Sequence, residues 1–276
     1  KGKEKINITT QEEMDVVLKE LEGKNYQVTS VKKGERRQKA PIPFTTSTLQ
    51  QEASKALNFP IQKTMRIAQQ LYEGVDIKGE GTVGLITYLR TDSTRISEEA
   101  DAAAHSFVAE HYGKEFEAET ANAKKTTGKI QDAHEAIRPS DINRIPSEIK
   151  DSLSRDQFRL YQLIWKRFTA SRMSPAQYET TSVKIQAAEH VFTVAASSMK
   201  FEGFMSVYTS DEDKEENNTL TTALSKDSVL SFVSFDAKQH FTQPPAHYTE
   251  ASLVRALEEL GIGRPSTYAP TITTII

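Results

Sequence analysis

The chain has 276 residues, of which 37% are hydrophobic and 26% are charged, so it has the composition of a globular protein rather than a disordered or fibrous one. Its formal net charge of -3 excludes nucleic-acid binding through bulk positive charge, and any DNA binding must come from local basic surfaces. The absence of cysteine excludes disulfides and cysteine-bound zinc, and no apolar run approaches the roughly 18 residues of a membrane-spanning helix.

The first part of the chain is expected to mix helix and strand. Hydrophobic spacing predicts a short helix from Glu12 to Leu21 and a strand from Tyr26 to Val31. The stretch 24–39 carries six basic residues against Glu35 alone. Such a run is typical of a solvated loop but also suits contact with phosphate groups, so both interpretations stay open here.

A helical hairpin is predicted next. Ser47 and Gln50 have the spacing of a capping box, and apolar residues at helical spacing follow up to Asn58. A second amphipathic pattern runs from Ile61 to Gly74, so the two helices resemble a helix-turn-helix. Such a hairpin is most often a packing unit, and DNA reading is the alternative.

A strand-to-helix connection is predicted over residues 83–113. The strand-like run ends at Leu89, a polar segment follows over residues 90–95, and Ser97 caps a helix that stops near Gly113. Backbone donors and side chains at such a connection can converge on an anion.

Tyr88 and Arg90 are the most informative pair in this connection. On a strictly extended backbone they point to one face, where a guanidinium favours the phenolate form of a tyrosine and can hold a phosphodiester oxygen. We expect the hydroxyls of Thr91, Ser93 and Thr94 to add anion donors nearby. From spacing alone, a half-buried strand tyrosine beside an exposed arginine is the ordinary interpretation.

The second half of the chain is predicted to pass from helix to strands. Ser154 begins a helix whose aromatic residues, including Trp165, are expected in the core. From Glu179 the apolar spacing alternates as in strands, and this pattern extends to Phe235. The acidic stretch 211–216 interrupts it and is interpreted as a solvated loop tip rather than a metal site.

A last helix is expected after Tyr248, with Thr249 as its cap and Gly261 at its end. The chain opens on Lys1 rather than methionine, and it closes on Ile276 without a residue that stops a helix. We therefore expect a piece of a longer protein.

The segment GLITYLRTDST around Tyr88 resembles the active-site signature of bacterial type IA DNA topoisomerases, which cut one DNA strand through a tyrosine ester. Four further segments match the family in order, from about residue 43 to the C-terminus. They are PFTTSTLQQEASKAL, TMRIAQQLYEG, DAHEAIRPS at 132–140, and YTEASLVRALEELGIGRPSTYAP at 248–270.

The resemblance implies a mixed α and β, multidomain fold in which a β-rich arch carries an α-rich, helix-turn-helix-like domain with the active-site tyrosine. The whole enzyme is expected to form a ring or padlock. The domains implied are the first part of the arch at 1–46, the α-rich domain at 47–174, the second part of the arch at 175–247, and the start of a truncated helical cleft domain at 248–276.

The resemblance makes Tyr88 the nucleophile that leaves a 5′-phosphotyrosyl bond and a free 3′-hydroxyl. It makes Arg90 the anchor of the scissile phosphate. Both roles rest on the resemblance, because the spacing of the two residues alone implies neither.

Further residues match family positions near DNA. His134 either contacts the DNA backbone or handles a proton, and Arg138 either reaches a phosphate or pairs with Glu135. Arg264 and Thr267 match positions that line the groove for single-stranded DNA, and the glycines beside them allow a close backbone approach.

Parts of the family pattern are missing from the sequence. Type IA enzymes hold Mg²⁺ on a glutamate and a DxDxE motif in an N-terminal Toprim domain, and neither that motif nor a C-terminal zinc ribbon occurs here. The resemblance therefore implies that the cofactor Mg²⁺ is held by a Toprim domain outside this chain, and we expect the chain alone to be inactive.

The whole enzyme is expected to act without ATP on single-stranded DNA and negatively supercoiled duplex DNA. Its other expected partner is its own missing Toprim domain, with no membrane contact and a cytoplasmic, nucleoid-associated location. Two competing interpretations are a non-enzymatic nucleic-acid-binding module and a structural or protein-interaction fragment.

Overall fold

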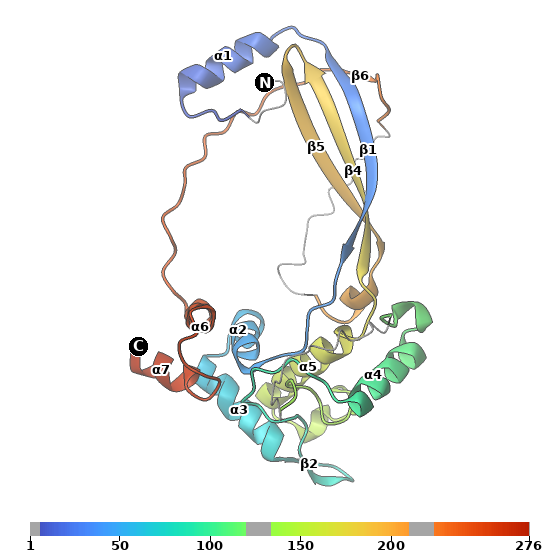
Figure 1. Ribbon diagram of the computed structural model, residues 1–276, viewed down its shortest axis with the longest axis vertical. Helices are drawn as coiled ribbons and strands as arrows, with labels where there is room; N and C mark the ends of the chain where they lie inside the picture. Colours follow the sequence, from blue (N-terminus) through green and yellow to red (C-terminus); the bar gives the residue numbers. More distant parts are fainter. Residues whose placement is uncertain (1–5, 120–133, 210–223, 276) are drawn as a thin grey trace. The chain divides into compact units, whose positions relative to one another are not determined.

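The computed structural model describes residues 6–119, 134–209 and 224–275, and the chain divides into two compact units (Figure 1). The first unit combines residues 1–38, 177–201 and 215–244, and the second combines residues 39–176, 202–214 and 245–276. Each unit is thus assembled from segments that lie far apart in the sequence. Helices and antiparallel strands both occur, which confirms the predicted mixed α and β class.

The described residues of the first unit form one helix and a four-stranded sheet. Helix α1 (Gln11–Leu21) begins after Thr10, and a capping box joins Thr10 to Glu13. In space the strands follow the order β5, β4, β1, β6. Their bounds are β1 (Tyr26–Gln38), β4 (Ala176–Ala187), β5 (His190–Phe201) and β6 (Val229–Leu230).

Two predictions for this unit were wrong. For the basic stretch 24–39 the solvated-loop interpretation was wrong, because most of the stretch belongs to β1, which continues to Gln38 beside β4, while contact with phosphate groups is not tested. The strand expected up to Phe235 ends at Leu230, since β6 pairs only with the first two residues of β1. The acidic stretch 211–216 lies outside the described residues.

The second unit consists mainly of helices. Helix α2 packs against α3, α5 and α6, and α7 packs against α3 and α6. Within the described part of the chain, no helix has the length and apolar character needed to cross a bilayer. The bounds are α2 (Thr46–Leu57), α3 (Ile61–Glu73), β2 (Val75–Ile77), β3 (Gly81–Val83), α4 (Glu98–His111), α5 (Arg155–Ala170), α6 (Glu250–Glu259) and α7 (Tyr268–Ile275), with single-turn helices at Lys114–Phe116, Lys150–Ser152 and Gly203–Ser206.

Most predicted helix starts in this unit are confirmed. Ser97, Ser154 and Thr249 accept hydrogen bonds from the first turns of α4, α5 and α6. Helix α2 begins earlier than predicted, because the capping box is made by Thr45 with Thr48 rather than by Ser47 with Gln50.

The aromatic face of α5 lies in the core, as predicted. Trp165 is 5% exposed, and its Nε1 donates a hydrogen bond to the carbonyl of Ile142 at 2.7 Å. The indole nitrogen is thus satisfied inside the protein. This burial excludes base stacking on Trp165 in the folded unit.

Candidate nucleophile site

Tyr88 lies on an irregular turn rather than on the strand predicted from Val83 to Leu89. Regular pairing ends at Val83, and only an isolated bridge joins Ile86 to Pro139. The chain bends after that bridge because Leu85, Ile86 and Leu89 are all drawn into the core. The tyrosine therefore projects from a turn whose neighbouring residues are buried.

One side of this turn is clamped to the segment that contains Arg138. The N–H of Thr87 donates to the carbonyl of Arg138 at 2.9 Å, and the N–H of Arg138 donates to Thr87 Oγ1 at 3.0 Å. The Thr87 hydroxyl in turn donates to the carbonyl of Ala136 at 2.7 Å. These bonds fix the backbone directly before Tyr88.

The other side of the turn is anchored by Thr46, the first residue of α2. Its hydroxyl donates to the carbonyl of Leu89 at 2.7 Å, and its N–H donates to the carbonyl of Thr91 at 2.9 Å. The N–H of Thr91 completes the set by donating to Thr46 Oγ1 at 2.9 Å. Tyr88 is thus held between two hydrogen-bonded anchors.

The Tyr88 ring is held by two neighbouring rings. It stacks on the imidazole of His134, with ring centroids 5.2 Å apart, and meets Tyr72 edge-on at 5.6 Å. The side chain is 39% exposed, and its hydroxyl has no hydrogen-bond partner among the described residues. The ring is therefore oriented while its oxygen stays open to an incoming group.

Arg90 is exposed on the same turn, and within the described chain its guanidinium makes no ion pair. Leu89, between Tyr88 and Arg90, is 1% exposed. Two exposed side chains on either side of a buried one suit the predicted arrangement, in which a phenol and a guanidinium act on the same group.

The expectation that Thr91 and Ser93 serve as surface anion donors was wrong. Both residues are buried, at 2% and 4% exposure. Thr91 Oγ1 accepts from the N–H of Ser93, and Ser93 Oγ accepts from the N–H of Arg95. These hydroxyls shape the turn, because short polar side chains readily bond to the backbone two residues on.

Arg138 pairs with Glu135, which was one of the two roles left open by the sequence. Its Nη2 and Nε lie 2.7 and 2.8 Å from Glu135 Oε2. Partial burial raises the pKa of Glu135. Hydrogen bonding and the charge of Arg138, together with hydrogen bonds from Ser97, lower that pKa by more than burial raises it, so the net shift is downward. The pair links the His134 segment to the start of α4.

Arg264 and Thr267 form a tight turn between α6 and α7. The N–H of Arg264 donates to Thr267 Oγ1 at 2.8 Å, and the N–H of Thr267 donates to the carbonyl of Arg264 at 2.8 Å. Gly261 and Gly263 have φ values of 68° and 84°, which favour glycine. Both predicted residues are exposed, so the loop presents them to solvent.

Electrostatics connect this loop region with the Tyr88 turn. Burial raises the pKa of Tyr268, the charges of Glu258 and Asp92 raise it further, and Arg264 opposes them. Asp92 follows Arg90 on the turn, so α7 begins within electrostatic range of it.

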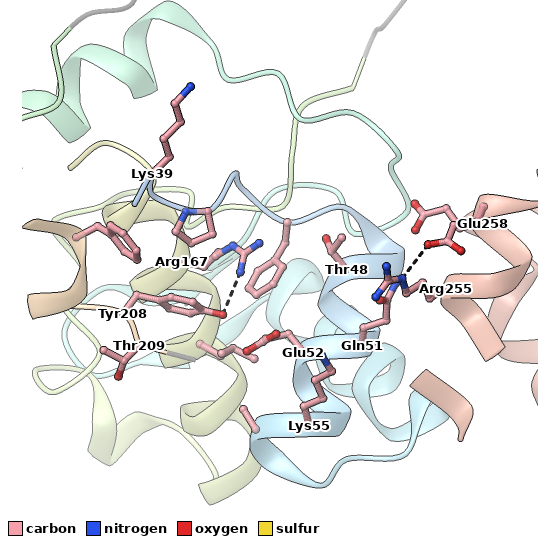
Figure 2. Close-up of a pocket in the computed structure, with 16 residues that line it drawn as sticks. Lys39, Thr48, Gln51, Glu52, Lys55, Arg167, Tyr208, Thr209, Arg255 and Glu258 are labelled. Atoms are coloured by element: carbon pink, nitrogen blue, oxygen red, sulfur yellow. Dashed lines mark hydrogen bonds and ion pairs between the residues drawn. The ribbon is translucent and has the colours of Figure 1, made fainter. Parts of the chain in front are cut away.

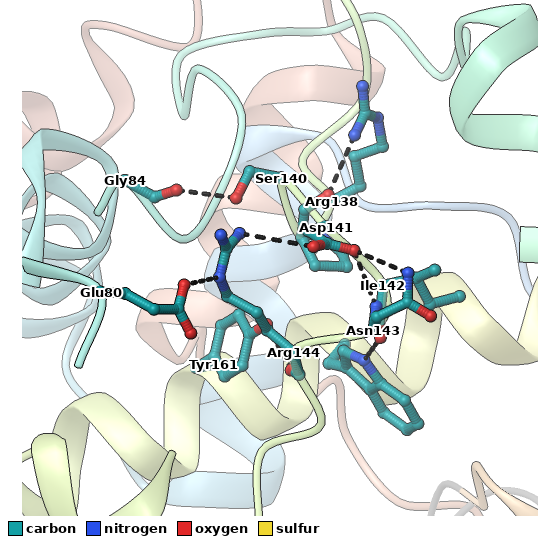
Figure 3. Close-up of polar contacts among 11 residues, drawn as sticks. Glu80, Gly84, Arg138, Ser140, Asp141, Ile142, Asn143, Arg144 and Tyr161 are labelled. Atoms are coloured by element: carbon teal, nitrogen blue, oxygen red, sulfur yellow. Dashed lines mark hydrogen bonds and ion pairs between the residues drawn. The ribbon is translucent and has the colours of Figure 1, made fainter. Parts of the chain in front are cut away.

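Figure 3 shows a polar network around residues 138–144, the segment that begins at Arg138. Ser140 Oγ donates to the carbonyl of Gly84 at 2.7 Å. Arg144 pairs with Glu80 at 3.0 Å, and Tyr161 donates to the carbonyl of Arg144 at 2.8 Å. These contacts tie residues 138–144 to α5 and to the hairpin of β2 and β3.

A separate hollow of about 940 Å³ in the second unit contains none of the predicted site residues (Figure 2). Arg167 spans it, donating to Tyr208 at 3.1 Å, while Arg255 pairs with Glu259 at 2.8 Å. Burial raises the pKa of Tyr208 well above its usual range. The guanidinium groups of Arg167 and Arg255 are thus already engaged by groups of the protein.

Tyr72 is the residue of the site that sequence reasoning missed. It lies within the amphipathic pattern predicted from Ile61 to Gly74, which gave it no role beyond helix packing, yet it is 39% exposed. Its position at the C-terminal end of α3 brings it to Tyr88 through the hairpin that follows. A large aromatic at the end of an amphipathic helix is a weak signal, because such residues commonly close a core.

A family model described as DNA topoisomerase matches residues 1–276. The chain therefore belongs to the bacterial DNA topoisomerase family, of type IA. Among solved structures it is similar to the full-length topoisomerase I of Thermotoga maritima, with 38% sequence identity and a TM-score of 0.83. That match covers 100% of this chain and 44% of the Thermotoga chain, so this sequence spans less than half of that relative's length.

Proposed function

We propose that this chain is the tyrosine-bearing part of an ATP-independent topoisomerase that relaxes negative supercoils. Tyr88 cuts one DNA strand, another strand passes through the break, and the break is then resealed. The observation that carries this proposal is Tyr88, whose backbone is clamped, whose ring stacks on His134 and meets Tyr72 edge-on, and whose hydroxyl has no hydrogen-bond partner among the described residues.

Cleavage begins when the phenolic oxygen of Tyr88 attacks a backbone phosphorus. A bond forms between that oxygen and phosphorus while the bond from phosphorus to the 3′ oxygen breaks. The phenol loses its proton, and the departing 3′ oxygen gains one. The products are a 5′-phosphotyrosyl ester and a 3′-hydroxyl, and attack by that hydroxyl reverses the step without ATP.

The neighbouring residues have distinct roles in this proposal. Arg90 binds a non-bridging oxygen of the scissile phosphate, since a guanidinium is suited to phosphate. His134 orients the Tyr88 ring and lies beside the path of the DNA backbone. Arg264 and Thr267 line the route of the single strand, while Arg138 positions the His134 segment through Glu135.

Magnesium is proposed to bind in a Toprim domain outside this chain. Across the described ranges, no three His, Asp or Glu side chains converge on a possible metal site, so these residues do not fit the ion and no step is routed through it. When bound in that domain, Mg²⁺ supplies positive charge at the reacting phosphate. The proposed substrates are single-stranded and negatively supercoiled DNA, in the cytoplasm at the nucleoid.

Covalent capture of DNA by a full-length enzyme carrying this chain tests the proposal. With Mg²⁺, an oligonucleotide labelled at its 3′ end is expected to remain attached to the protein after denaturation, while a 5′-labelled fragment is released. Peptide mapping is expected to place the adduct on Tyr88. Tyr88→Phe is expected to fold and bind single strands as the parent does and to form no adduct. An adduct on another residue, or relaxation by Tyr88→Phe, contradicts the proposal.

A further inference from the structure

The second half of β1 carries a cluster of cations in the first unit. We call it the basic edge, and it consists of Lys32, Lys33, Arg36 and Arg37, with Glu35 as the acidic residue among them. Lys32, Lys33 and Arg37 are exposed, and within the described residues their side chains form no ion pair. The cluster spans about 17 Å at the usual rise of a strand.

Among the described strands, this half of β1 has a neighbour on one side only (Figure 1). Strand β6 pairs only with Tyr26 and Gln27, and one further turn bonds to Val28. Beyond Val28, β1 has β4 on one side and no described strand on the other. Successive side chains of a strand point to opposite faces of the sheet. The basic edge therefore presents cations on both faces, and no described strand separates the two faces at this edge of the sheet.

One of these cations is held in place by an aromatic ring. The guanidinium carbon of Arg36 lies 4.3 Å from the centroid of the Tyr178 ring on β4. Tyr178 is 3% exposed, so the ring is a fixed support rather than a platform for a base. Stacking of this kind lowers the entropy lost when an arginine binds an anion.

A hollow of about 500 Å³ lies beside the basic edge and is lined in part by Lys33, Glu179 and Lys200. Lys200 Nζ lies 3.2 Å from Glu179 Oε2, so the charge of that carboxylate is offset. Glu35 also lines the hollow and offsets the charge of Lys33, so the hollow carries no net charge and adds a concave surface, rather than positive charge, beside the basic edge.

We propose that the basic edge binds the phosphate backbone of single-stranded DNA. The choice of DNA rests on the proposed function, while the site itself rests on the cations of β1. A rigid duplex reaches only one face of a sheet at a time, whereas a single strand can follow cations that alternate around a free border. The basic edge belongs to a different unit from Tyr88 and is a binding surface rather than part of the catalytic site.

A purely structural role predicts something different. Charged residues, lysine above all, protect exposed sheet edges from pairing with other chains. Under that role, altering the basic edge promotes aggregation and leaves DNA binding unchanged. The two explanations therefore separate in a binding measurement made on monomeric protein.

The test uses this 276-residue chain and a fluorescein-labelled oligothymidine, with anisotropy measured over a series of KCl concentrations. Lys33→Glu with Arg37→Glu is expected to weaken binding at low salt about tenfold or more and to lower the salt slope by about 1.4, the value for two lost single-strand contacts. A control with the same charge change, Lys19→Glu with Lys226→Glu, lies elsewhere in the first unit and is expected to change binding less than about twofold.

Glu35→Gln gives a test in the opposite direction. Removing this carboxylate from among the cations is expected to strengthen binding by about two- to threefold, which loss of folding does not produce. Equal effects of the two charge-reversed pairs overturn the proposal, as do aggregation without loss of binding and a change confined to a duplex probe. If Tyr88 forms no adduct, the proposed function is refuted. The binding measurements still decide whether the basic edge binds single-stranded DNA, because they do not depend on the adduct.

Discussion

At the scale of single residues, the spacing of Tyr88 and Arg90 is set by the leucine between them. Leu89 is buried and its carbonyl accepts the Thr46 hydroxyl, so the two exposed side chains are held at the ends of a fixed turn. Preorganisation of this kind matters for phosphoryl transfer, because the reacting groups then need little rearrangement on binding. In the proposed reaction the phenol of Tyr88 forms the bond to phosphorus, and the guanidinium of Arg90 supplies positive charge.

Arg90→Ala in a full-length enzyme is expected to slow cleavage without abolishing the adduct. Loss of one charge-assisted phosphate contact costs about 1.5 to 3 kcal/mol, which corresponds to a rate reduction of about 10- to 100-fold. Single-turnover cleavage of an oligonucleotide measures this. Arg66→Ala, an exposed arginine on α3, serves as control. Unchanged cleavage in Arg90→Ala removes the arginine from the mechanism.

Tyr72 is expected to position Tyr88 through its ring rather than its hydroxyl. An aromatic pair contributes about 0.5 to 1.5 kcal/mol, so Tyr72→Leu is expected to reduce the cleavage rate by roughly 2- to 10-fold. Tyr72→Phe keeps the edge-on contact and should cleave normally, and both variants should bind DNA as the parent does. Equal loss in the two variants points to the hydroxyl instead.

At the scale of elements, the segment that carries His134 is held by charge. Partial burial raises the pKa of Glu135, but Arg138 and Ser97 together bring it below the ordinary 4.5. A carboxylate with a depressed folded pKa stabilises the protein above its unfolded pKa, and that contribution is lost as the pH falls through the folded value.

Glu135→Gln is therefore expected to flatten the acid side of the stability profile below pH 4.5. Urea unfolding of parent and variant over a pH series measures the effect. The parent should lose more stability than the variant as the pH falls, because only the parent has a carboxylate to protonate. Parallel losses in the two proteins show that the Arg138 pair does not contribute.

Helix starts were largely predictable because caps are local. Ser154 and Thr249 lie within three residues of the groups they bind. The start of α2 was misplaced because several hydroxyl residues in a row could each cap it, and the choice depends on a distant contact. The isolated bridge between Phe44 and Ile137 fixes the chain just before Thr45, and no local pattern contains that information.

The family resemblance named candidate site residues but not their arrangement. Family resemblance named Tyr88 and His134, yet their stacking joins segments separated by a stretch outside the described residues. The strand expected around Tyr88 failed for a related reason. Leucines at alternating positions are typical of a strand in the sequence. The hydrogen bonds of the Thr46 and Thr87 hydroxyls that bend the chain there are tertiary contacts, which no local pattern contains.

At the scale of the whole molecule, the proposed function divides the reaction between this chain and the part of the enzyme outside it. The chain supplies a nucleophile, an arginine and part of a DNA groove. Phosphodiester cleavage also requires stabilisation of the negative charge that develops at the phosphate, and in this proposal Arg90 is the residue of the chain that contacts that phosphate. The remainder is proposed to come from Mg²⁺ and the Toprim domain.

The chain by itself is therefore expected to bind single strands weakly, to lose them as salt rises, and to form no adduct. Adding a separately produced Toprim domain in trans, with Mg²⁺ and a single-stranded oligonucleotide, should restore covalent attachment at Tyr88. The control is the same mixture with Tyr88→Phe, which keeps every surface except the attacking oxygen. If the chain forms the adduct unaided, its own residues supply the missing stabilisation, because Arg90 and its neighbours then neutralise the developing charge without a second domain.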